Sequence, residues 1–557
     1  MLSIFANSWH IFSPILIIFG LYWYFTRNFD FFTKQGITGP KPWVGIGNLW
    51  ELFFTSMPEL ELERYKKFGK IYGVFEGNKP ILRIGDPELV KKVLVKEFNV
   101  YQTRRETSNA KHPVIDLIIS QASGDDWRRM RSTATPTFSS AKLRKVFKLL
   151  DQSMNGFVEA LKTKAVPQRV VDMKWWFACY SMDVIANCIF GASTQAYTDP
   201  TDPIVVNARS LYRPKFWKIV VTLLFPTRLL NWLNIHSETN DQAIDYFVQI
   251  TRKLLRLKEA EGREGAAKNS QFNDFVDILM RRNAIDKVLD GEGDGHEGGE
   301  QEDEDDGELN PLDDGMAAKI VSKPKTTTAA PDVKVPSPKP FDGRKPMTDD
   351  EIIAQVFSSL NGGFEATTNA LAFCAHELAL HPDVQERLYE EVNDALANTN
   401  GEITYETLGK LTYLDAVINE SMRLHSAALR PTRVAAAEHT LGDTGITIRK
   451  GQTIELMVYA MHRSDEYWPR ASRFDPERFM PENKANIIPY SYLPFGGGPR
   501  ACIGQRFSLM VVKLAIARIV RQFKFAPCER TQVPVPLTKH LRFKAAQSIY
   551  LHIEARG

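Results

Sequence analysis

The most informative stretch of the chain is Phe495-Gly-Gly-Gly-Pro-Arg-Ala-Cys-Ile-Gly504. It is a glycine-rich bend that presents one cysteine, Cys502, and an apolar helical pattern follows from Phe507. A thiol just before a helix N-terminus lies near the positive end of the helix dipole and near free backbone N–H groups. We therefore expect the pKa of the Cys502 thiol to be lowered, which makes the thiolate available as a ligand.

Thiolate is the soft ligand that iron takes in heme-thiolate proteins. The glycines around Cys502 let the backbone pass close to a flat macrocycle, and Arg500 is placed to meet a propionate on its edge. The alternative is a buried structural cysteine in a loop, which the density of glycines argues against.

Composition sets the broad class. The 557 residues are 43% hydrophobic and 25% charged, which excludes a collagen, a wholly disordered chain and a multi-span transporter. Five cysteines without a Cys-x-x-Cys pair argue against a disulfide scaffold and a structural zinc site. The net charge of +3 hides an acidic run at 290–314 in an otherwise basic chain. This favours an acidic partner or an anionic lipid surface, and no aromatic-interleaved basic run supports nucleic acid as a partner.

The N-terminus has the pattern of a membrane anchor. Residues 11–25 are almost wholly apolar, aromatic residues gather at 22–24, and Arg27 opens a basic flank. About 20 apolar residues span a bilayer, and the basic flank places the following chain in the cytosol. A cleaved signal peptide is the alternative, but the basic n-region and the cleavage site are missing. We therefore predict an anchor at 1–27 and a Pro/Gly-rich hinge at 28–48.

The body, at 49–557, is predicted to be mostly helical. Thr348-Asp-Asp-Glu351 is a capping box, and apolar helical spacing continues to Leu380, which predicts a long central helix. A second amphipathic helix is predicted at 411–424, and alternation around Lys450-Gly451 predicts a hairpin at 446–457.

Two stretches of the body stand apart from this pattern. A segment at about 285–346 has too few apolar residues to bury and is predicted to be a disordered, acidic and Pro/Lys-rich insertion. The apolar stretch at 217–233 is too short to span a membrane, which leaves a core helix or a membrane-dipping loop.

The cysteine bend resembles that of the cytochrome P450 family. Cys502-Ile-Gly-Gln-Arg-Phe-Ser-Leu-Met510 and the segment 36–47 resemble the animal microsomal, xenobiotic-metabolising branch, and the likeness runs from the anchor to about Phe525, the insertion excepted. The resemblance implies a mainly α fold, the P450 helical prism with small β-sheets, behind an N-terminal transmembrane helix. It also implies heme b (iron protoporphyrin IX), with Cys502 as the iron ligand and Phe495 and Arg500 beside it.

Other family motifs appear in order along the chain. Glu420-Ser-Met-Arg423 matches Glu-x-x-Arg, and Arg478 in Phe474-Asp-Pro-Glu-Arg-Phe479 matches its partner, so Glu420, Arg423 and Arg478 are expected to form a structural core. Trp127-Arg-Arg-Met-Arg131 matches Trp-x-x-x-Arg. By resemblance, Trp127, Arg131 and Arg433 are expected to contact heme propionates.

The oxygen-activation motif departs from the family pattern. Gly362-Gly-Phe-Glu-Ala366 supplies the acid Glu365, but Ala366 occupies the usual threonine position. An acid and a hydroxyl relay protons through water during oxygen cleavage. Thr367 is the next hydroxyl, but adjacent helical positions are rotated by about 100°. It is therefore expected to serve only if the helix bulges at Gly362-Gly363.

The resemblance implies a monooxygenase that oxidises lipophilic substrates with electrons from NADPH. A separate NADPH–cytochrome P450 reductase is expected, with cytochrome b5 as a further candidate partner, because no GxGxxG nicotinamide fingerprint is present. The expected location is the endoplasmic reticulum membrane. One alternative is a heme-thiolate isomerase or dehydratase acting on lipid peroxides without a reductase, which suits the alanine at 366. Another is a non-catalytic heme sensor or carrier.

Overall fold

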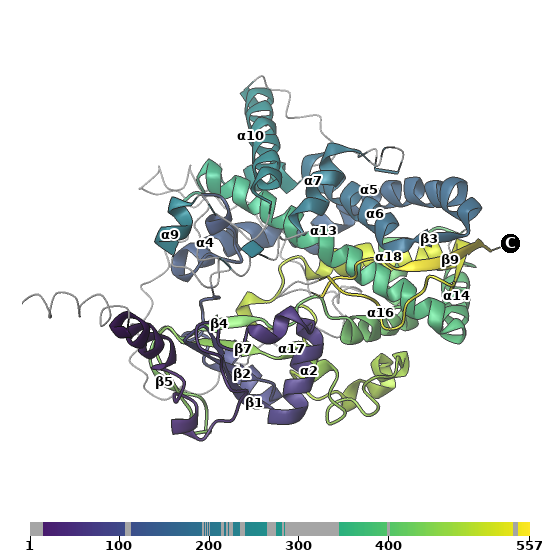
Figure 1. The fold of residues 1–557 in the computed structure, drawn as a ribbon. Coiled ribbons are helices and arrows are strands. Elements are labelled where there is room, and N and C mark those ends of the chain that lie inside the picture. The colour runs from purple at the N-terminus through teal and green to yellow at the C-terminus, as the bar shows by residue number, and fades with distance from the viewer. Residues whose placement is uncertain are drawn as a thin grey trace, which may run out of the picture.

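The computed structural model describes residues 15–105, 113–191, 345–397, 401–538 and 544–556, together with most of 194–263 and residues 275–280 and 283. Helices form most of the molecule, and a small sheet lies to one side, at the lower left of Figure 1. The predicted insertion lies outside the described residues except at its last two positions.

The helices of the body include, in chain order, α2 (Met57–Phe68), α3 (Pro87–Lys91), α4 (Gly124–Ala134), α5 (Ser140–Ala160), α6 (Met173–Phe190), α7 (Pro203–Leu211), α9 (Thr227–Trp232), α10 (Asp241–Arg263), α13 (Asp349–Leu380), α14 (Pro382–Ala397), α15 (Tyr405–Lys410), α16 (Thr412–Leu424), α17 (Val458–His462) and α18 (Gln505–Gln522).

The predicted central helix is confirmed as α13. The Thr348 side chain accepts a hydrogen bond from the Glu351 N–H, and the Glu351 side chain accepts one from the Thr348 N–H, so the capping box is formed. Its apolar side chains pack against α6, α16 and α18 in the core. The predicted helix at 411–424 is confirmed as α16.

Three small sheets complete the fold. The largest has the order β1 (Ile71–Glu76), β2 (Lys79–Ile84), β7 (Thr453–Leu456) and β4 (Thr432–Val434). The second pairs β3 (Val170–Asp172) and β8 (Phe523–Ala526) with β9 (Tyr550–Ala555), and the third pairs β5 (His439–Thr440) with β6 (Thr447–Ile448).

The predicted hairpin at 446–457 is wrong. The chain does turn at Lys450-Gly451, but β6 before the turn pairs with β5, while β7 after it pairs with β2 and β4. Alternation identified both strands, although β7 is buried on both faces, yet partners distant in the sequence decided the pairing.

The N-terminal region combines an exposed helix with a packed segment. Residues 15–26 are helical, and the large apolar side chains between 15 and 24 are 45–67% exposed. No helix within the described part of the chain is long and apolar enough to cross a membrane; residues 1–14 of the predicted anchor lie outside that part. Phe31 and Phe32 are buried, and the Gly73 N–H donates to the Thr38 carbonyl at 2.9 Å. The segment at 28–48 is thus joined to β1.

Candidate active site

The cysteine bend is shaped by glycine and closed by its own backbone. Gly498 has a φ of 68°, and a Cβ there would overlap the carbonyl oxygen of Leu94, so a larger residue would have to displace the short helical segment Lys92–Lys96. The Cys502 N–H donates to the Phe495 carbonyl at 3.0 Å. Helix α18 begins at Gln505, three residues after the cysteine. The half-buried Phe495 ring packs against two apolar clusters.

Cys502 is accessible to solvent, although many protein atoms lie around its thiol. Burial raises its pKa, and the lowering effects of the Gly504 N–H and of Arg131 and Arg104 do not overcome it. The expected net lowering by the helix N-terminus is therefore wrong for the protein alone, because desolvation of a thiolate outweighs these partial charges. A metal cation that binds the sulfur would reverse this balance.

Guanidinium groups gather around this cysteine. Arg104, Arg131, Arg433 and Arg500 each donate to a backbone carbonyl: those of Arg500 (2.8 Å), Ala501 (2.9 Å), Thr432 (2.8 Å) and Ala122 (2.7 Å), respectively. Among the residues that the structure describes, none of the four forms an ion pair with a carboxylate. Arg433 and Arg500 are only 2% and 3% exposed.

This cluster is electrostatically incomplete. Burial, with repulsion from Arg104 and Arg500, lowers the pKa of Arg433 well below its usual value, and burial with Arg104 and Arg131 lowers that of Arg500 to about 9. Nε of Arg433 and Nε and Nη1 of Arg500 are buried without a hydrogen-bond partner within the described residues. Buried cations require anions. Two propionates of a heme placed over the Cys502 sulfur fit this need.

The sequence-predicted residues of the cradle come together, with one addition. The Arg500 guanidinium lies 4.4 Å from the centre of the Trp127 ring, so α4 contacts the cysteine bend. Arg433, on β4, belongs to the same cluster. Arg104 was not predicted as a cofactor-binding residue. Its one signal in the sequence is a basic pair with Arg105 in an uncharacterised loop, which has no specificity.

The predicted Glu420, Arg423 and Arg478 group is also assembled. Glu420 and Arg423 form two bonds of 2.7 Å, and Arg478 Nε lies 3.4 Å from Glu420 Oε1. Arg423 also donates to the carbonyls of His462 and Ala471. Glu420 and Arg423 are fully buried, so this group joins α16 to the chain that precedes the cysteine bend.

The acid of the oxygen-activation motif has a partner that the sequence did not predict. Glu365 Oε1 lies 2.9 Å from Nζ of Lys174, on α6, and accepts a 2.8 Å bond from the amide of Asn369. Lys174 Nζ also donates to the Ala546 carbonyl. The acid, the cation and the C-terminal loop therefore form one network.

The described face of α13 beside this network lacks a hydroxyl at the usual position. Gly362 is exposed, with open space where a Cβ would be, and Ala366 one turn later is half-buried. Thr367 is buried, and α13 runs through Gly362-Gly363 without a bulge. The condition under which Thr367 was expected to act is thus not met in this conformation.

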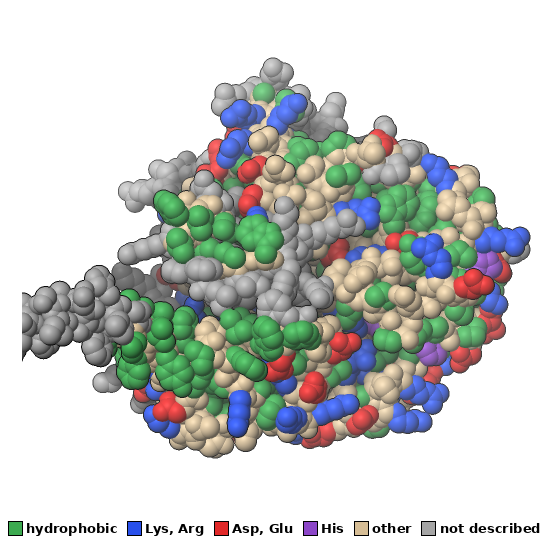
Figure 2. Space-filling view, viewed as in Figure 1, with side chains coloured by type: hydrophobic (Ala, Val, Ile, Leu, Met, Phe, Trp, Pro, Cys, Tyr) green, Lys and Arg blue, Asp and Glu red, His purple; other side chains and the backbone are tan. Residues whose placement is uncertain are grey.

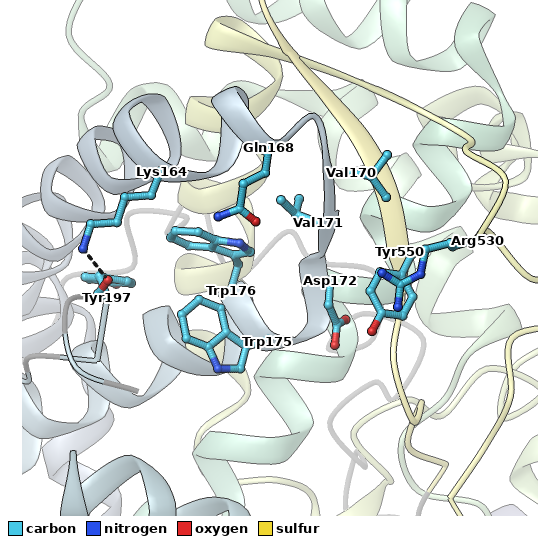
Figure 3. A pocket seen from close by; sticks show the side chains of 10 residues that line it. All are labelled: Lys164, Gln168, Val170, Val171, Asp172, Trp175, Trp176, Tyr197, Arg530 and Tyr550. Carbon is cyan, nitrogen blue, oxygen red and sulfur yellow. Dashed lines mark hydrogen bonds between the residues drawn. The ribbon is translucent and has the colours of Figure 1, made fainter. Parts of the chain in front are cut away.

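A pocket of about 360 Å³ lies elsewhere, between the start of α6, β3 and β9. Figure 3 shows the side chains that line it, including Trp175, Trp176 and Tyr550. None of the predicted site residues lines it. The predicted chemistry therefore belongs to the cysteine bend and not to this pocket.

Comparison with known proteins agrees with this geometry. The family model described as Cytochrome P450 matches residues 37–299 and 337–552. This chain is a cytochrome P450. It is 34% identical over 557 residues to Cytochrome P450 3A11 of Mus musculus and 33% identical over 555 residues to Cytochrome P450 3A1 of Rattus norvegicus. Each match covers 99% of this chain and 97% of the relative.

Family membership establishes the chemistry. This P450 is a heme-thiolate monooxygenase that acts on lipophilic substrates and takes electrons through a reductase. It binds heme b through a cysteine thiolate. The two matched parts of the chain are separated by residues 300–336, which fall within the predicted insertion.

Proposed function

We propose that this P450 monooxygenates lipophilic substrates at the endoplasmic reticulum membrane, with Cys502 as the iron ligand and the four arginines as the propionate cradle. The observation that carries the assignment of residues is the cluster of buried guanidinium groups around one exposed thiol, without a carboxylate partner in the described part of the chain. Heme bound there supplies the activation of dioxygen. The chain's own residues hold the group in place, exclude water and deliver protons.

Each cradle residue has a separate task. Arg433 and Arg500 would neutralise the heme propionates through the nitrogens that lack a partner among the described residues, and Arg104 and Arg131 would add positive charge beside them. Trp127 supports Arg500 from α4. Glu420, Arg423 and Arg478 hold the chain beneath the cysteine bend and touch neither substrate nor cofactor.

Glu365 is the proposed source of protons. Lys174 and Asn369 hold its carboxylate, and the open space at the exposed Gly362, one turn before the half-buried Ala366, leaves room for water on this helix. Water there would replace the missing hydroxyl at 366. Thr367 contributes only when α13 opens at Gly362-Gly363.

Membrane attachment is proposed from exposed apolar surface. Besides the apolar side chains of the helix at 15–26, the chain exposes Trp43, Trp50 and Phe54, which are 60%, 42% and 74% exposed. In Figure 2, hydrophobic side chains gather on the side where the N-terminal segment joins the body. At the end of α9, Trp232 is 78% exposed while Leu230 is fully buried, so one side of this helix packs in the core and Trp232 is available for membrane contact. We place residues 1–27 in the bilayer and the body in the cytosol, where cytochrome b5 is a second candidate donor.

The test is product formed per NADPH consumed, in membranes with added reductase and a panel of lipophilic substrates. Wild type and Ala366→Thr are compared. Tight coupling in wild type supports the water-assisted relay, and Ala366→Thr then changes coupling little. Poor coupling that a hydroperoxide substrate rescues without reductase contradicts the assignment of Glu365 and favours isomerase chemistry.

A further inference from the structure

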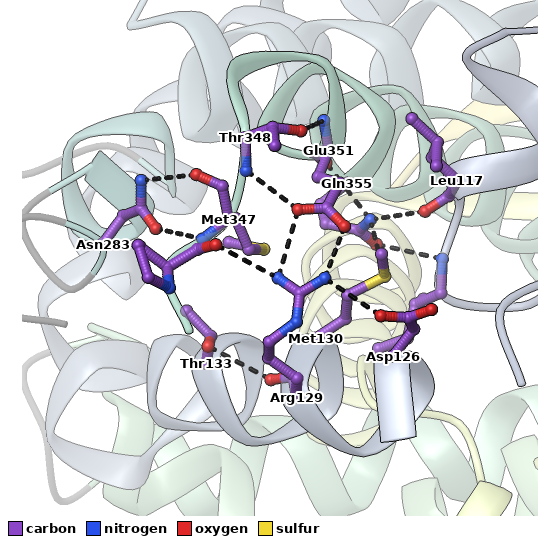
Figure 4. A network of polar contacts seen from close by, with 12 residues as sticks. Leu117, Asp126, Arg129, Met130, Thr133, Asn283, Met347, Thr348, Glu351 and Gln355 are labelled. Carbon is purple, nitrogen blue, oxygen red and sulfur yellow. Dashed lines mark hydrogen bonds and ion pairs between the residues drawn. The ribbon is translucent and has the colours of Figure 1, made fainter. Parts of the chain in front are cut away.

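Gln355 makes a paired contact with the backbone of a loop that precedes α4. Its side chain, 2% exposed, donates from Nε2 to the Leu117 carbonyl at 2.9 Å and accepts at Oε1 from the Ile119 N–H at 3.0 Å (Figure 4). One amide thus bonds two alternate residues as a neighbouring strand would. We propose that Gln355 is a positioning residue, which holds the segment 113–122 against α13 and so sets the substrate-side wall of the active site.

The other end of this segment is held by the cofactor cradle. Arg500 Nη2 donates to the Ala122 carbonyl at 2.7 Å, and Arg500 lies two residues before Cys502. The segment therefore runs from a bond on the long helix to a bond on the cysteine bend. A displacement of either bonded end would break one of these contacts.

The side chains of the segment belong to an apolar cluster that extends to the cysteine bend. Val114 and Ile118 are buried in one apolar cluster with Phe357 and Leu360 of α13. Ile503, the neighbour of Cys502, packs against the same cluster. Because Ile503 is adjacent to Cys502, we infer that a lipophilic molecule bound at the cysteine bend meets this cluster, whose shape then selects among substrates.

The contact belongs to a rigid node. Gln355 Nε2 also donates to the Glu351 carbonyl at 3.2 Å, and the Glu351 carboxylate binds Arg129 of α4 through two nitrogens. Because α4 also carries Trp127 and Arg131, the node joins the long helix to the cradle. An apolar residue at 355 would leave the Arg129 bonds intact and remove both bonds to the segment, together with the bond to the Glu351 carbonyl within α13.

The chain offers a matched control. Gln385 of α14 is fully buried, donates from Nε2 to the Phe525 carbonyl at 2.9 Å and accepts from the Phe525 N–H at 2.8 Å. Gln385→Leu therefore removes the same kind of paired contact, but on β8 rather than on the segment 113–122. A general loss of stability affects both variants, whereas a change in substrate selection is expected only of Gln355→Leu.

The test rests on the proposed function and uses the full-length heme-loaded protein with two probes, imidazole and a bulky lipophilic azole, followed by heme absorbance. Gln355→Leu is expected to weaken binding of the bulky azole about tenfold, leave imidazole binding unchanged and broaden the product distribution. Gln385→Leu is expected to lower Tm, but to leave the binding of the bulky azole relative to imidazole and the product distribution unchanged. Equal loss for both probes, or the same change in both variants, overturns the proposal.

A measurement on wild type keeps the proposal testable if Gln355→Leu does not fold. In amide hydrogen exchange, the Ile119 N–H is expected to exchange as slowly as amides in the body of α13, because its acceptor is buried. Exchange at the rate of an open loop overturns the proposal. Azole binding and hydrogen exchange need no turnover. An enzyme that binds azoles but forms no product would therefore refute the proposed function, while the role of Gln355 would still be decided by the binding and exchange measurements.

Discussion

Glu455→Gln should destabilise the sheet that carries Arg433, whereas Glu61→Gln, in the same ion-pair network, should have little effect. Glu455, on β7, accepts from Arg83 at 2.9 Å and from Arg430 at 2.8 Å. Glu61, on α2, lies 3.2 Å from Arg430 and accepts from the Ala460 N–H. All four charged side chains are 5% exposed or less, so the two carboxylates share two cations away from water.

The two carboxylates differ in their ionisation. Burial disfavours the charge on Glu455, but Arg430, Arg83 and Arg105 prevail and lower its pKa to about 2. Burial raises the pKa of Glu61 to about 7 despite the same arginines. Relative to the ordinary glutamate pKa of about 4.5, the lowered pKa of Glu455 corresponds to about 3 kcal/mol of stability at neutral pH. Ionisation of Glu61 recovers part of this in Glu455→Gln, so we expect a loss of about 2 to 3 kcal/mol.

The sign of the pH dependence follows from these directions. The contribution of Glu455 is present above its unfolded pKa and is lost as the pH falls from about 4.5 to about 2. Glu61 acts oppositely, because its raised pKa makes folding bind a proton. Its contribution lowers the free energy of unfolding as the pH rises from about 4.5 to about 7, including about 1 kcal/mol between pH 6 and 8.

The assay is denaturant unfolding of the heme-loaded chain at pH 6 and pH 8, with heme absorbance and tryptophan fluorescence as two probes. We expect Glu61→Gln to stay within about 1 kcal/mol of wild type and to flatten the difference between the two pH values. We expect the double variant to lose more than the sum of the single losses, since both arginines are then without a carboxylate. Equal losses for the two single variants would refute the reasoning.

Three other outcomes follow from the site. Arg433→Met should release heme about tenfold faster to an apo-myoglobin acceptor while Tm changes little, because a buried cation is removed together with its anion contact; unchanged release contradicts the cradle. Lys174→Met should lower product per NADPH about threefold or more with unchanged substrate affinity, and Lys174→Arg should retain most of it; equal coupling in all three forms removes Lys174 from proton delivery. Deleting 290–314 should leave the heme spectrum intact, because Asn283 and Met347 join the flanks through two hydrogen bonds of 2.9 and 2.5 Å; loss of heme contradicts the interpretation as an insertion.

What could be predicted from the sequence was local or periodic. The cap at Thr348 and the apolar spacing after it defined α13, because a helix is specified by residues within a few positions of each other. The pairing of Glu420 with Arg423 likewise spans one helical turn.

What could not be predicted depends on residues far apart in the chain. Lys174 reaches Glu365 across 191 positions, and Arg104 reaches the Arg500 carbonyl across 396. Lysines and arginines are common, so neither residue differs in the sequence from a solvated surface cation. For the protein alone, the predicted direction of the Cys502 pKa shift was wrong. The helix dipole can be inferred from the sequence, whereas the burial that outweighs it cannot.

The bonded segment between the exposed N-terminal helix and β1 has a mechanical consequence. Only residues 27–30 separate the helix at 15–26 from the buried Phe31, and the Asn48 side chain accepts from the Phe75 N–H at 2.8 Å. In the membrane attachment proposed above, so short a connection would prevent the body from rotating freely about the N-terminal helix. The catalytic domain should therefore keep one orientation relative to the membrane, and its rotational diffusion should be slow. It should then present the same face to every reductase that approaches along the membrane.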